Sequence, residues 1–305
     1  MPHEPMTAPS IGTDEERSAA NMHGIAAMIA SMFCFNTNDM LIKLASEDLP
    51  TGQIVFLRGL VATGLLALLA WRQGALRAVP EVGRKPFAWR AVSDALGTLV
   101  FLTALFQMSL ATATAILQSL PIFLTIVSAV FLKETVRWRR WAAVLVGFGG
   151  VLMIIQPGGE GFNVYSLLAV ASLGLIIVRD LSTRYIPKTV HTLTISVVGS
   201  FAVMVSGGVM SLFETWRPVS PGDALLLGGA ALFLIGGYVS IVAAMRSGEL
   251  STVAPFRYAI ILFALTYSYI FWGEIPNAVA MVGIFLVVAS GIYVFHREGR
   301  AKRRG

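Results

Sequence analysis

The sequence carries little charge for its length. Of its 305 residues, 13% are Asp, Glu, Lys or Arg, while 56% are hydrophobic. A typical soluble domain has roughly 25% charged residues. A water-soluble fold of this size could not cover its surface with so few charges, so the composition excludes that class and indicates a protein embedded in lipid.

Cysteine and histidine are also scarce. The one cysteine, Cys34, lies inside the first apolar run, which excludes a disulfide framework and a cysteine metal cluster. The four histidines, His3, His23, His191 and His296, fall in the N-terminal tail or near the ends of apolar runs. No HExxH, P-loop or GxSxG motif is present. We therefore expect that the protein binds no metal or cofactor and is not an enzyme. An intramembrane enzyme is the third functional hypothesis, below the two given at the end of this subsection.

What the sequence does have is apolar runs of membrane-spanning length. Each is near the roughly 20 residues that cross a hydrocarbon layer of about 30 Å, and each must be helical because lipid satisfies no backbone groups. The sequence predicts an all-α integral membrane protein with ten transmembrane helices. The expected spans are 23–44, 52–71, 88–108, 112–132, 138–155, 163–183, 190–213, 222–245, 251–271 and 276–295.

The distribution of cations predicts the orientation of these spans. If the N-terminal tail marks side one, 18 of the 23 Lys and Arg residues fall on that side. They are Arg17, Arg72, Arg77, Arg84, Lys85, Arg90, Lys133, Arg137, Arg139, Arg140, Arg184, Lys188, Arg246, Arg297, Arg300, Lys302, Arg303 and Arg304. The positive-inside rule then places both termini in the cytoplasm, which requires an even number of crossings. The net charge of +6 thus reflects membrane topology, and no nucleic-acid partner is expected.

Both ends of the chain are polar. Residues 1–22 contain three prolines and a charged run, and we expect a disordered cytoplasmic tail there. The apolar run that follows is too long for a secretory signal and lacks a basic flank and a cleavage site. Residues 296–305 are predicted to form a basic cytoplasmic tail. No segment between the spans is long enough to be a further domain.

The second half of the chain echoes the first at an offset of 140 to 141 residues. Leu110-Ala-Thr112 matches Leu250-Ser-Thr252, and Phe131-Leu-Lys-Glu134 matches Phe271-Trp-Gly-Glu274. If each half crosses the bilayer five times, the second half starts on the opposite face, so the two copies have inverted topology. Many secondary transporters are built in this way.

One charged pair is repeated with the halves. Asp39 and Lys43 are four residues apart on one helix face and can form an ion pair, and Asp180 and Arg184 repeat this spacing, with Arg179 matching Asn38. The two pairs would lie at opposite mouths of the protein. We interpret Lys43, Arg179, Asp180 and Arg184 as gating or coupling residues; the alternative is that they are interfacial charges at helix ends.

Several polar side chains within the spans are candidates for contact with a solute. Asn36, Asn38 and Asp39 make the first span polar over one turn, and Gln118 lies three residues before Pro121, where a kink is expected. Tyr267 in the ninth span lies deep enough to line a cavity. Hydrogen bonding between helices is the alternative for these groups.

Two arginines and an aspartate lie about 9 Å inside their spans. Arg257 follows Pro255 and precedes Tyr258, so a guanidinium and a phenol there suit a carboxylate or phosphate of a substrate. Arg58 is the second candidate, and we group Asp94 with the gating or coupling residues, as a partner for an arginine or a proton site. The alternatives are pairing with a carboxylate or reaching for the interface. Arg58 matches Gly199 in the other half and Arg257 matches Leu117, and these asymmetric positions are where we expect the substrate.

Several segments together resemble the EamA family of the drug/metabolite transporter superfamily. They are Ala113-Thr-Ala-Ile-Leu-Gln-Ser-Leu-Pro-Ile-Phe123, Leu132-Lys-Glu134 and Gly147-Phe-Gly-Gly-Val-Leu152, with Ser251-Thr-Val-Ala-Pro-Phe256 and Phe271-Trp-Gly-Glu-Ile-Pro276 in the second half. The resemblance implies two inverted five-helix repeats, at residues 23–155 and 163–295. It also implies a central cavity lined mainly by spans 1, 3, 4, 6, 8 and 9, with spans 5 and 10 peripheral. Glu134 and Glu274 are interpreted as helix-end residues.

The leading hypothesis is a secondary transporter in the cytoplasmic (inner) membrane that moves a small polar organic metabolite by alternating access. The resemblance implies a vitamin such as riboflavin, an amino acid or an S-adenosylmethionine-like solute. With no nucleotide site, a gradient or exchange would drive transport. The alternative is a non-transporting membrane receptor or assembly subunit that binds a lipid or a partner. The expected partners are the solute and the bilayer, and a homodimer is possible.

Overall fold

The computed structural model describes residues 14–75, 85–130, 138–158, 162–187, 190–247 and 250–302. Every regular element in these ranges is a helix. Eight helices are long and apolar enough to cross a membrane, and two shorter apolar helices, Trp141–Ile155 and Ala278–Val294, bring the total to ten. The predicted fold class, a multi-pass all-α membrane protein, is confirmed.

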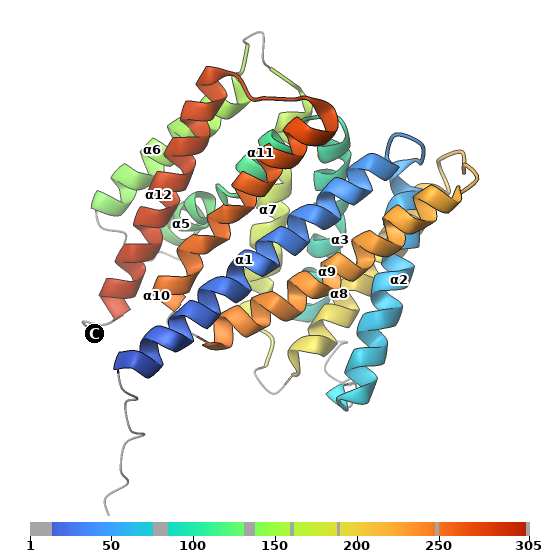
Figure 1. Ribbon diagram of the computed structural model, residues 1–305, viewed down its shortest axis with the longest axis horizontal. Coiled ribbons are helices and arrows are strands. Elements are labelled where there is room, and N and C mark those ends of the chain that lie inside the picture. Colours follow the sequence, from blue (N-terminus) through green and yellow to red (C-terminus); the bar gives the residue numbers. More distant parts are fainter. Residues whose placement is uncertain are drawn as a thin grey trace, which may run out of the picture.

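Each half of the chain supplies five crossings. The first half comprises α1 (Asp14–Ala45), α2 (Thr51–Arg72), α3 (Lys85–Phe106), α4 (Leu110–Leu117) with α5 (Leu120–Val130), and α6 (Trp138–Ile155). The second comprises α7 (Tyr165–Arg184), α8 (Thr192–Ser211), α9 (Pro221–Ser247), the broken crossing α10 (Leu250–Val253), η2 (Ala254–Tyr258) and α11 (Ala259–Trp272), and α12 (Ala278–Lys302). We call the face where α1 begins and α12 ends the terminal face, and the other the opposite face (Figure 1).

The main helix pairs each join one half of the chain to the other. α1 packs along α9, α3 along α7, α2 along α8, and α6 along α12 (Figure 1). The offset of about 140 residues makes α1 equivalent to α7 and α3 equivalent to α9, so the α1–α9 pair is equivalent to the α3–α7 pair. The α2–α8 and α6–α12 pairs each join a helix to its own equivalent in the other half. A two-fold relation between inverted repeats gives this pattern.

Two crossings are broken at equivalent points. α4 ends at Leu117 and α5 begins at Leu120, because Pro121 has no N–H to donate to the Leu117 carbonyl. In the second half, Pro255 lies in the 3₁₀ turn of η2 between α10 and α11. Gln118 and Tyr258, 140 residues apart, lie at the two breaks. The kink expected at Pro121 is confirmed, and it has a counterpart in the second half.

The crossing of α6 and α12 is close because glycines meet there. A Cβ atom on Gly150 would lie 2.8 Å from the Gly283 carbonyl oxygen, and one on Gly283 would lie 2.6 Å from that of Gly150. Any side chain would therefore push the two backbones apart. These two helices lie together at one edge of the bundle (Figure 1).

Candidate functional site

A cavity of about 420 Å³ lies where the two halves meet. Its walls come from α1, α2, α3, α7, α8 and α9 and from both broken crossings. Its polar lining residues are Asn38, Asp39, Arg58, Asp94, Thr98, Gln118, Arg179, Ser200, Tyr238 and Arg257. The family resemblance pointed mainly to spans 1, 3, 4, 6, 8 and 9, and the structure adds α2 and α8, the second and seventh spans.

The lining positions of the cavity come in equivalent pairs. Arg58, Gly59 and Ala62 on α2 correspond to Gly199, Ser200 and Val203 on α8, and all six line the cavity. Asp94, Thr98 and Phe101 on α3 correspond in the same way to Leu234, Tyr238 and Ile241 on α9. The cavity therefore straddles the axis between the repeats. Its backbone positions are symmetric, whereas its chemistry is not.

An amide joins a cation and an anion in the C-terminal part of α1. Asn38 donates from Nδ2 to Asp39 Oδ1 at 2.9 Å and accepts from Arg58 Nη1 at 3.1 Å. Arg58 is the cation that acts electrostatically on Asp39. The Arg58 residue is 6% exposed, and its buried Nε has no hydrogen-bond partner among the described residues. Arg58 therefore points into the protein and does not extend to the membrane interface.

A second charged network joins α3 to α7. Arg179 Nη1 lies 3.2 Å from Asp94 Oδ1, and Arg179 Nη2 lies 2.9 Å from Asp180 Oδ1. Arg90 adds a longer contact of 3.6 Å to Asp94 Oδ2 and donates to Thr183 Oγ1 at 3.0 Å. Two cations and two anions thus offset one another. The network links one helix from each repeat.

Arg257 differs from the other cavity arginines. Its carbonyl accepts a hydrogen bond from Gln118 Nε2 at 3.2 Å. Arg257 lines the cavity, and among the residues that the structure describes its guanidinium has no ion pair or hydrogen bond. Asp180 acts on it electrostatically without contact. Since Asp39 offsets Arg58 and the α3–α7 network is balanced, Arg257 is the uncompensated positive charge of the described cavity.

The structure brings together seven of the predicted residues. Asn38, Asp39, Arg58, Gln118 and Arg257 line the cavity as expected for solute contacts, and Asp94 and Arg179 line it from the gating set. Their roles in binding or gating stay predictions. Sequence reasoning missed Thr98, Ser200, Tyr238 and the neighbouring Arg90. Thr98 and Tyr238 are 140 residues apart, so the offset between the repeats could have predicted that they occupy equivalent positions.

The predicted ion pair between Asp39 and Lys43 is wrong. Lys43 Nζ donates to the carbonyls of Leu105, at 3.2 Å, and Met108, and it lies 5.1 Å from the ring centroid of Trp272. Carbonyls at the end of a helix have no partners within it, and the buried ammonium of Lys43 satisfies one in the last turn of α3 and one in the segment that follows it. Asp39 instead accepts a hydrogen bond from the Asn38 amide.

The second predicted pair is only partly described. Asp180 is bound by Arg179, the residue next to it, whose Nε also donates to Asp180 Oδ1 at 2.9 Å. The side chain of Arg184 lies outside the described residues, so its pairing with Asp180 stays a prediction.

Three predicted solute contacts lie outside the cavity lining. Asn36 donates to Thr114 Oγ1 at 3.4 Å, and Tyr267 shares a hydrogen bond of 2.9 Å with Thr37, so both join helices. Tyr258 is 5% exposed, and within the described part of the chain its buried hydroxyl has no hydrogen-bond partner. The Tyr258 ring packs on Gly291 of α12. A Cβ atom at Gly291 would lie 1.6 Å from the Tyr258 hydroxyl oxygen, so only glycine leaves room for the ring there.

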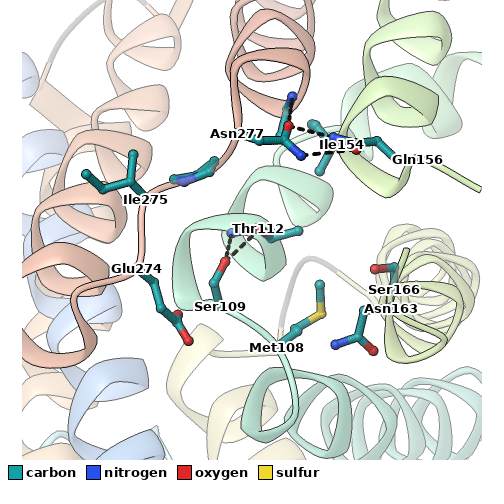
Figure 2. Close-up of a pocket in the computed structure, with 12 residues that line it drawn as sticks. Met108, Ser109, Thr112, Ile154, Gln156, Asn163, Ser166, Glu274, Ile275 and Asn277 are labelled. Carbon is teal, nitrogen blue, oxygen red and sulfur yellow. Dashed lines mark hydrogen bonds between the residues drawn. The ribbon is translucent and has the colours of Figure 1, made fainter. Parts of the chain in front are cut away.

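A second pocket, of about 330 Å³, opens near the opposite face (Figure 2). Its polar groups largely satisfy one another: Ser109 caps α4 by accepting from the Thr112 N–H at 3.1 Å, and Gln156 and Asn277 exchange two hydrogen bonds of 2.7 and 3.1 Å. Glu274 follows Gly273, which ends α11 in the left-handed conformation. The buried Oε2 of Glu274 has no hydrogen-bond partner among the residues described. Glu134 lies outside the described residues.

The two pockets differ in chemistry. Glu274 is the ionisable residue that lines the pocket of Figure 2, whereas the central cavity is lined by Asp39, Arg58, Asp94, Arg179 and Arg257. The central cavity also lies between the repeats, where substrate sites of transporters with inverted repeats are found. It is the candidate functional site.

Ten membrane helices in two inverted repeats around a polar cavity define a membrane transporter. The chain belongs to the EamA-like transporter family, which matches residues 22–156 and 163–295. A solved structure has a similar fold, with a TM-score of 0.60 and 16% identity over 93% of this chain and 99% of that one.

Relatives with this fold carry transporter names. The chain is 27% identical over 278 residues to the pseudopaline exporter CntI of Pseudomonas aeruginosa, covering 88% of this chain and 94% of the exporter. It is 23% identical over 291 residues to the S-adenosylmethionine uptake transporter of Rickettsia felis, covering 92% and 95%. It is 28% identical over 228 residues to the riboflavin transporter of Vibrio cholerae, covering 72% and 74%. These comparisons indicate a membrane transporter of small metabolites, not an enzyme.

Proposed function

We propose that this protein is a secondary transporter that moves a small polar organic metabolite with an anionic or zwitterionic group through the central cavity by alternating access. The observation that carries the proposal is the uncompensated guanidinium of Arg257 in that cavity. The proposed solute is a vitamin such as riboflavin, an amino acid or an S-adenosylmethionine-like compound. The names of the relatives, which refer to pseudopaline, S-adenosylmethionine and riboflavin, support this range.

The cavity offers complementary groups to such a solute. Arg257 can hold a carboxylate or phosphate, since a guanidinium presents donors that match both. The Asn38, Asp39 and Arg58 cluster supplies donors and acceptors further along the cavity. Tyr238, which packs edge-on against Phe35 at a centroid distance of 5.4 Å, adds an aromatic wall.

The same geometry supports alternating access. Lys43 and Trp272 hold α1, α3 and α11 together on the opposite-face side of the cavity, while the Arg179 network joins α3 to α7. Because each contact links helices that must separate for the solute to pass, we assign Lys43, Asp94, Arg179, Asp180 and Arg184 to gating or coupling. The excess of cations on the terminal face supports an inner-membrane location with both termini in the cytoplasm.

The first experiment identifies the solute. Thermal shift of the detergent-solubilised protein is measured against amino acids, riboflavin, flavin nucleotides, S-adenosylmethionine and nucleosides. We expect stabilisation by a compound with a carboxylate or phosphate, since binding to the folded state raises its stability. If none of these compounds stabilises the protein, the metabolite class is wrong as stated.

The second experiment separates a transporter from a receptor. The protein is reconstituted in liposomes, and labelled solute is measured as it exchanges with unlabelled solute inside. Arg257→Ala should abolish most of the flux, whereas Arg246→Ala, which removes an equal charge from the exposed end of α9, should retain it. Binding of the solute without flux in the unaltered protein would favour the receptor alternative.

A further inference from the structure

A groove of about 500 Å³ runs between α6 and α12, away from the central cavity. Trp138, Arg139 and Val146 lie on the α6 side and Tyr293 on the α12 side. Trp138 is 73% exposed and Tyr293 is 41% exposed. All of its lining residues belong to these two helices, which lie at one edge of the bundle (Figure 1), so its exposed side chains are placed to meet the bilayer.

The shape of the groove follows from residue size. The two helices meet closely at Gly150 and Gly283. Toward the terminal face the floor is made of small residues, Ala142, Ala143, Ala289 and Ser290. The Ser290 hydroxyl donates to the Val287 carbonyl at 3.0 Å, so the floor presents no free polar group there. From Trp138 to Val146 the groove extends about 12 Å along α6. The length of the groove and its floor of small residues suit an acyl chain.

The terminal-face end of the groove is positively charged. The Arg139 guanidinium lies 5.5 Å from the centroid of the Trp138 ring, which suits the interfacial depth of both residues. The sequence around the start of α6 and the end of α12 is also rich in cations, several of them outside the described residues: Lys133, Arg137, Arg139 and Arg140, and Arg297, Arg300, Lys302, Arg303 and Arg304. Glu134 and Glu298 are the acidic residues of these two stretches. A ligand with a negative headgroup therefore fits, and a neutral one gains less.

We propose that this groove binds an anionic phospholipid, with one acyl chain over the alanine floor and the phosphate at Arg139. The groove is separate from the substrate cavity, and the inference stands whether or not the transported solute is the one proposed. A lipid held there fills the space between the two peripheral helices, where an empty groove would lose contacts.

Tryptophan quenching by brominated lipid tests the site directly. A variant that keeps Trp138 and replaces the other five tryptophans with phenylalanine is reconstituted in vesicles with brominated phosphatidylglycerol or brominated phosphatidylcholine. We expect half-maximal quenching at about fivefold less brominated phosphatidylglycerol, which corresponds to one cation worth ~1 kcal/mol at an anionic surface. A matched variant that keeps only Trp71, which is exposed at the end of α2 outside the groove, should show no such preference.

The role of Arg139 is tested in the same vesicles. Arg139→Gln in the Trp138-only variant should remove the fivefold preference and leave quenching by phosphatidylcholine unchanged. If the multiple replacements prevent folding, the difference in quenching between the unaltered protein and Trp138→Phe gives the same quantity. Equal curves for the two lipids at Trp138, or an equal preference at Trp71, would overturn the proposal. So would a Trp138 that neither lipid quenches, which would mean that protein, such as a second copy of the chain, covers the groove.

Discussion

Gln118 and Arg257 join the two broken crossings of this protein across its central cavity. The amide nitrogen of Gln118 donates to the Arg257 carbonyl at 3.2 Å, and both residues lie where a proline interrupts a membrane helix. An unsatisfied carbonyl at membrane depth is costly, because neither lipid nor a regular helix supplies a donor. A side chain of the first repeat thus supplies the hydrogen-bond donor for a backbone carbonyl of the second repeat, at the helix break beside the cavity.

Replacing Gln118 should therefore impair transport more than it impairs folding. Gln118→Leu keeps the size of the side chain but removes the donor, leaving the Arg257 carbonyl unpaired at a cost of about 1–3 kcal/mol. Arg257 would lose its fixed position in the cavity. We expect a lower rate of liposome exchange and a higher KM, with a monodisperse detergent-solubilised protein.

A matched variant distinguishes this linkage from a general packing effect. Gln107→Leu changes the same residue type outside the cavity, where its carbonyl and not its side chain accepts from Asn163. That variant should transport normally. Equal losses in the two variants would contradict a specific role for the hydrogen bond to Arg257.

Lys43 is expected to hold the opposite-face side of the cavity closed. Lys43→Met removes the donor to the Leu105 and Met108 carbonyls, which lose their buried partner. The closed arrangement should be destabilised relative to one open to the opposite face. With Ser200→Cys as a reporter in a Cys34→Ser background, we expect faster labelling of the cavity by a membrane-impermeant thiol reagent added from the opposite face.

A second cation on the opposite face, Arg217, provides the control for this prediction. Arg217→Met removes a cation from the same face, one whose side chain donates to the Asp48 carbonyl at 3.0 Å and which does not line the cavity. Labelling of the reporter should be unchanged in that variant. Unchanged labelling in Lys43→Met as well would remove Lys43 from the gate.

Much of the architecture could be predicted because membrane insertion leaves strong marks in a sequence. Ten apolar runs, a one-sided distribution of cations and an offset of 140 residues were enough to give ten helices in inverted repeats. Pro121 marked one helix break, since the missing N–H is a local property. Arg58 and Arg257 were candidates for the cavity because a charge is costly in lipid, with the interface or a carboxylate partner as the alternative, and both line it.

The choice of partners could not be predicted from spacing. Asp39 and Lys43 are correctly placed for an ion pair four residues apart, yet the free carbonyls of α3 take the ammonium. Those carbonyls reach Lys43 only after α1 and α3 pack. Tyr258 follows Arg257 in the sequence but points to α12, since a 3₁₀ turn sends consecutive side chains in different directions. Such outcomes depend on tertiary packing.

Gly199 should be required for the network between α3 and α7. A Cβ atom there would lie 2.7 Å from Asp94 Oδ2 and 2.9 Å from Arg90 Nη1, so Gly199→Ala must displace one or both side chains. Overpacking of this kind costs about 1–3 kcal/mol. We expect lower thermal stability and slower exchange. Gly64→Ala, on α2 with no atom of the described residues within 4 Å of the added Cβ, should change neither quantity. Similar losses in both variants would refute a specific steric role.

Tyr258 tests whether the residue next to Arg257 contacts the solute. Its hydroxyl is buried against Gly291 and has no hydrogen-bond partner in the described ranges, so Tyr258→Phe removes a polar group that gains nothing from burial. We expect equal or higher thermal stability and unchanged KM for the transported solute. Gly291→Ala, whose Cβ would overlap the hydroxyl, should destabilise the protein, and adding Tyr258→Phe should recover part of the loss. A raised KM in Tyr258→Phe alone would instead indicate that the hydroxyl reaches the solute, as the sequence suggested.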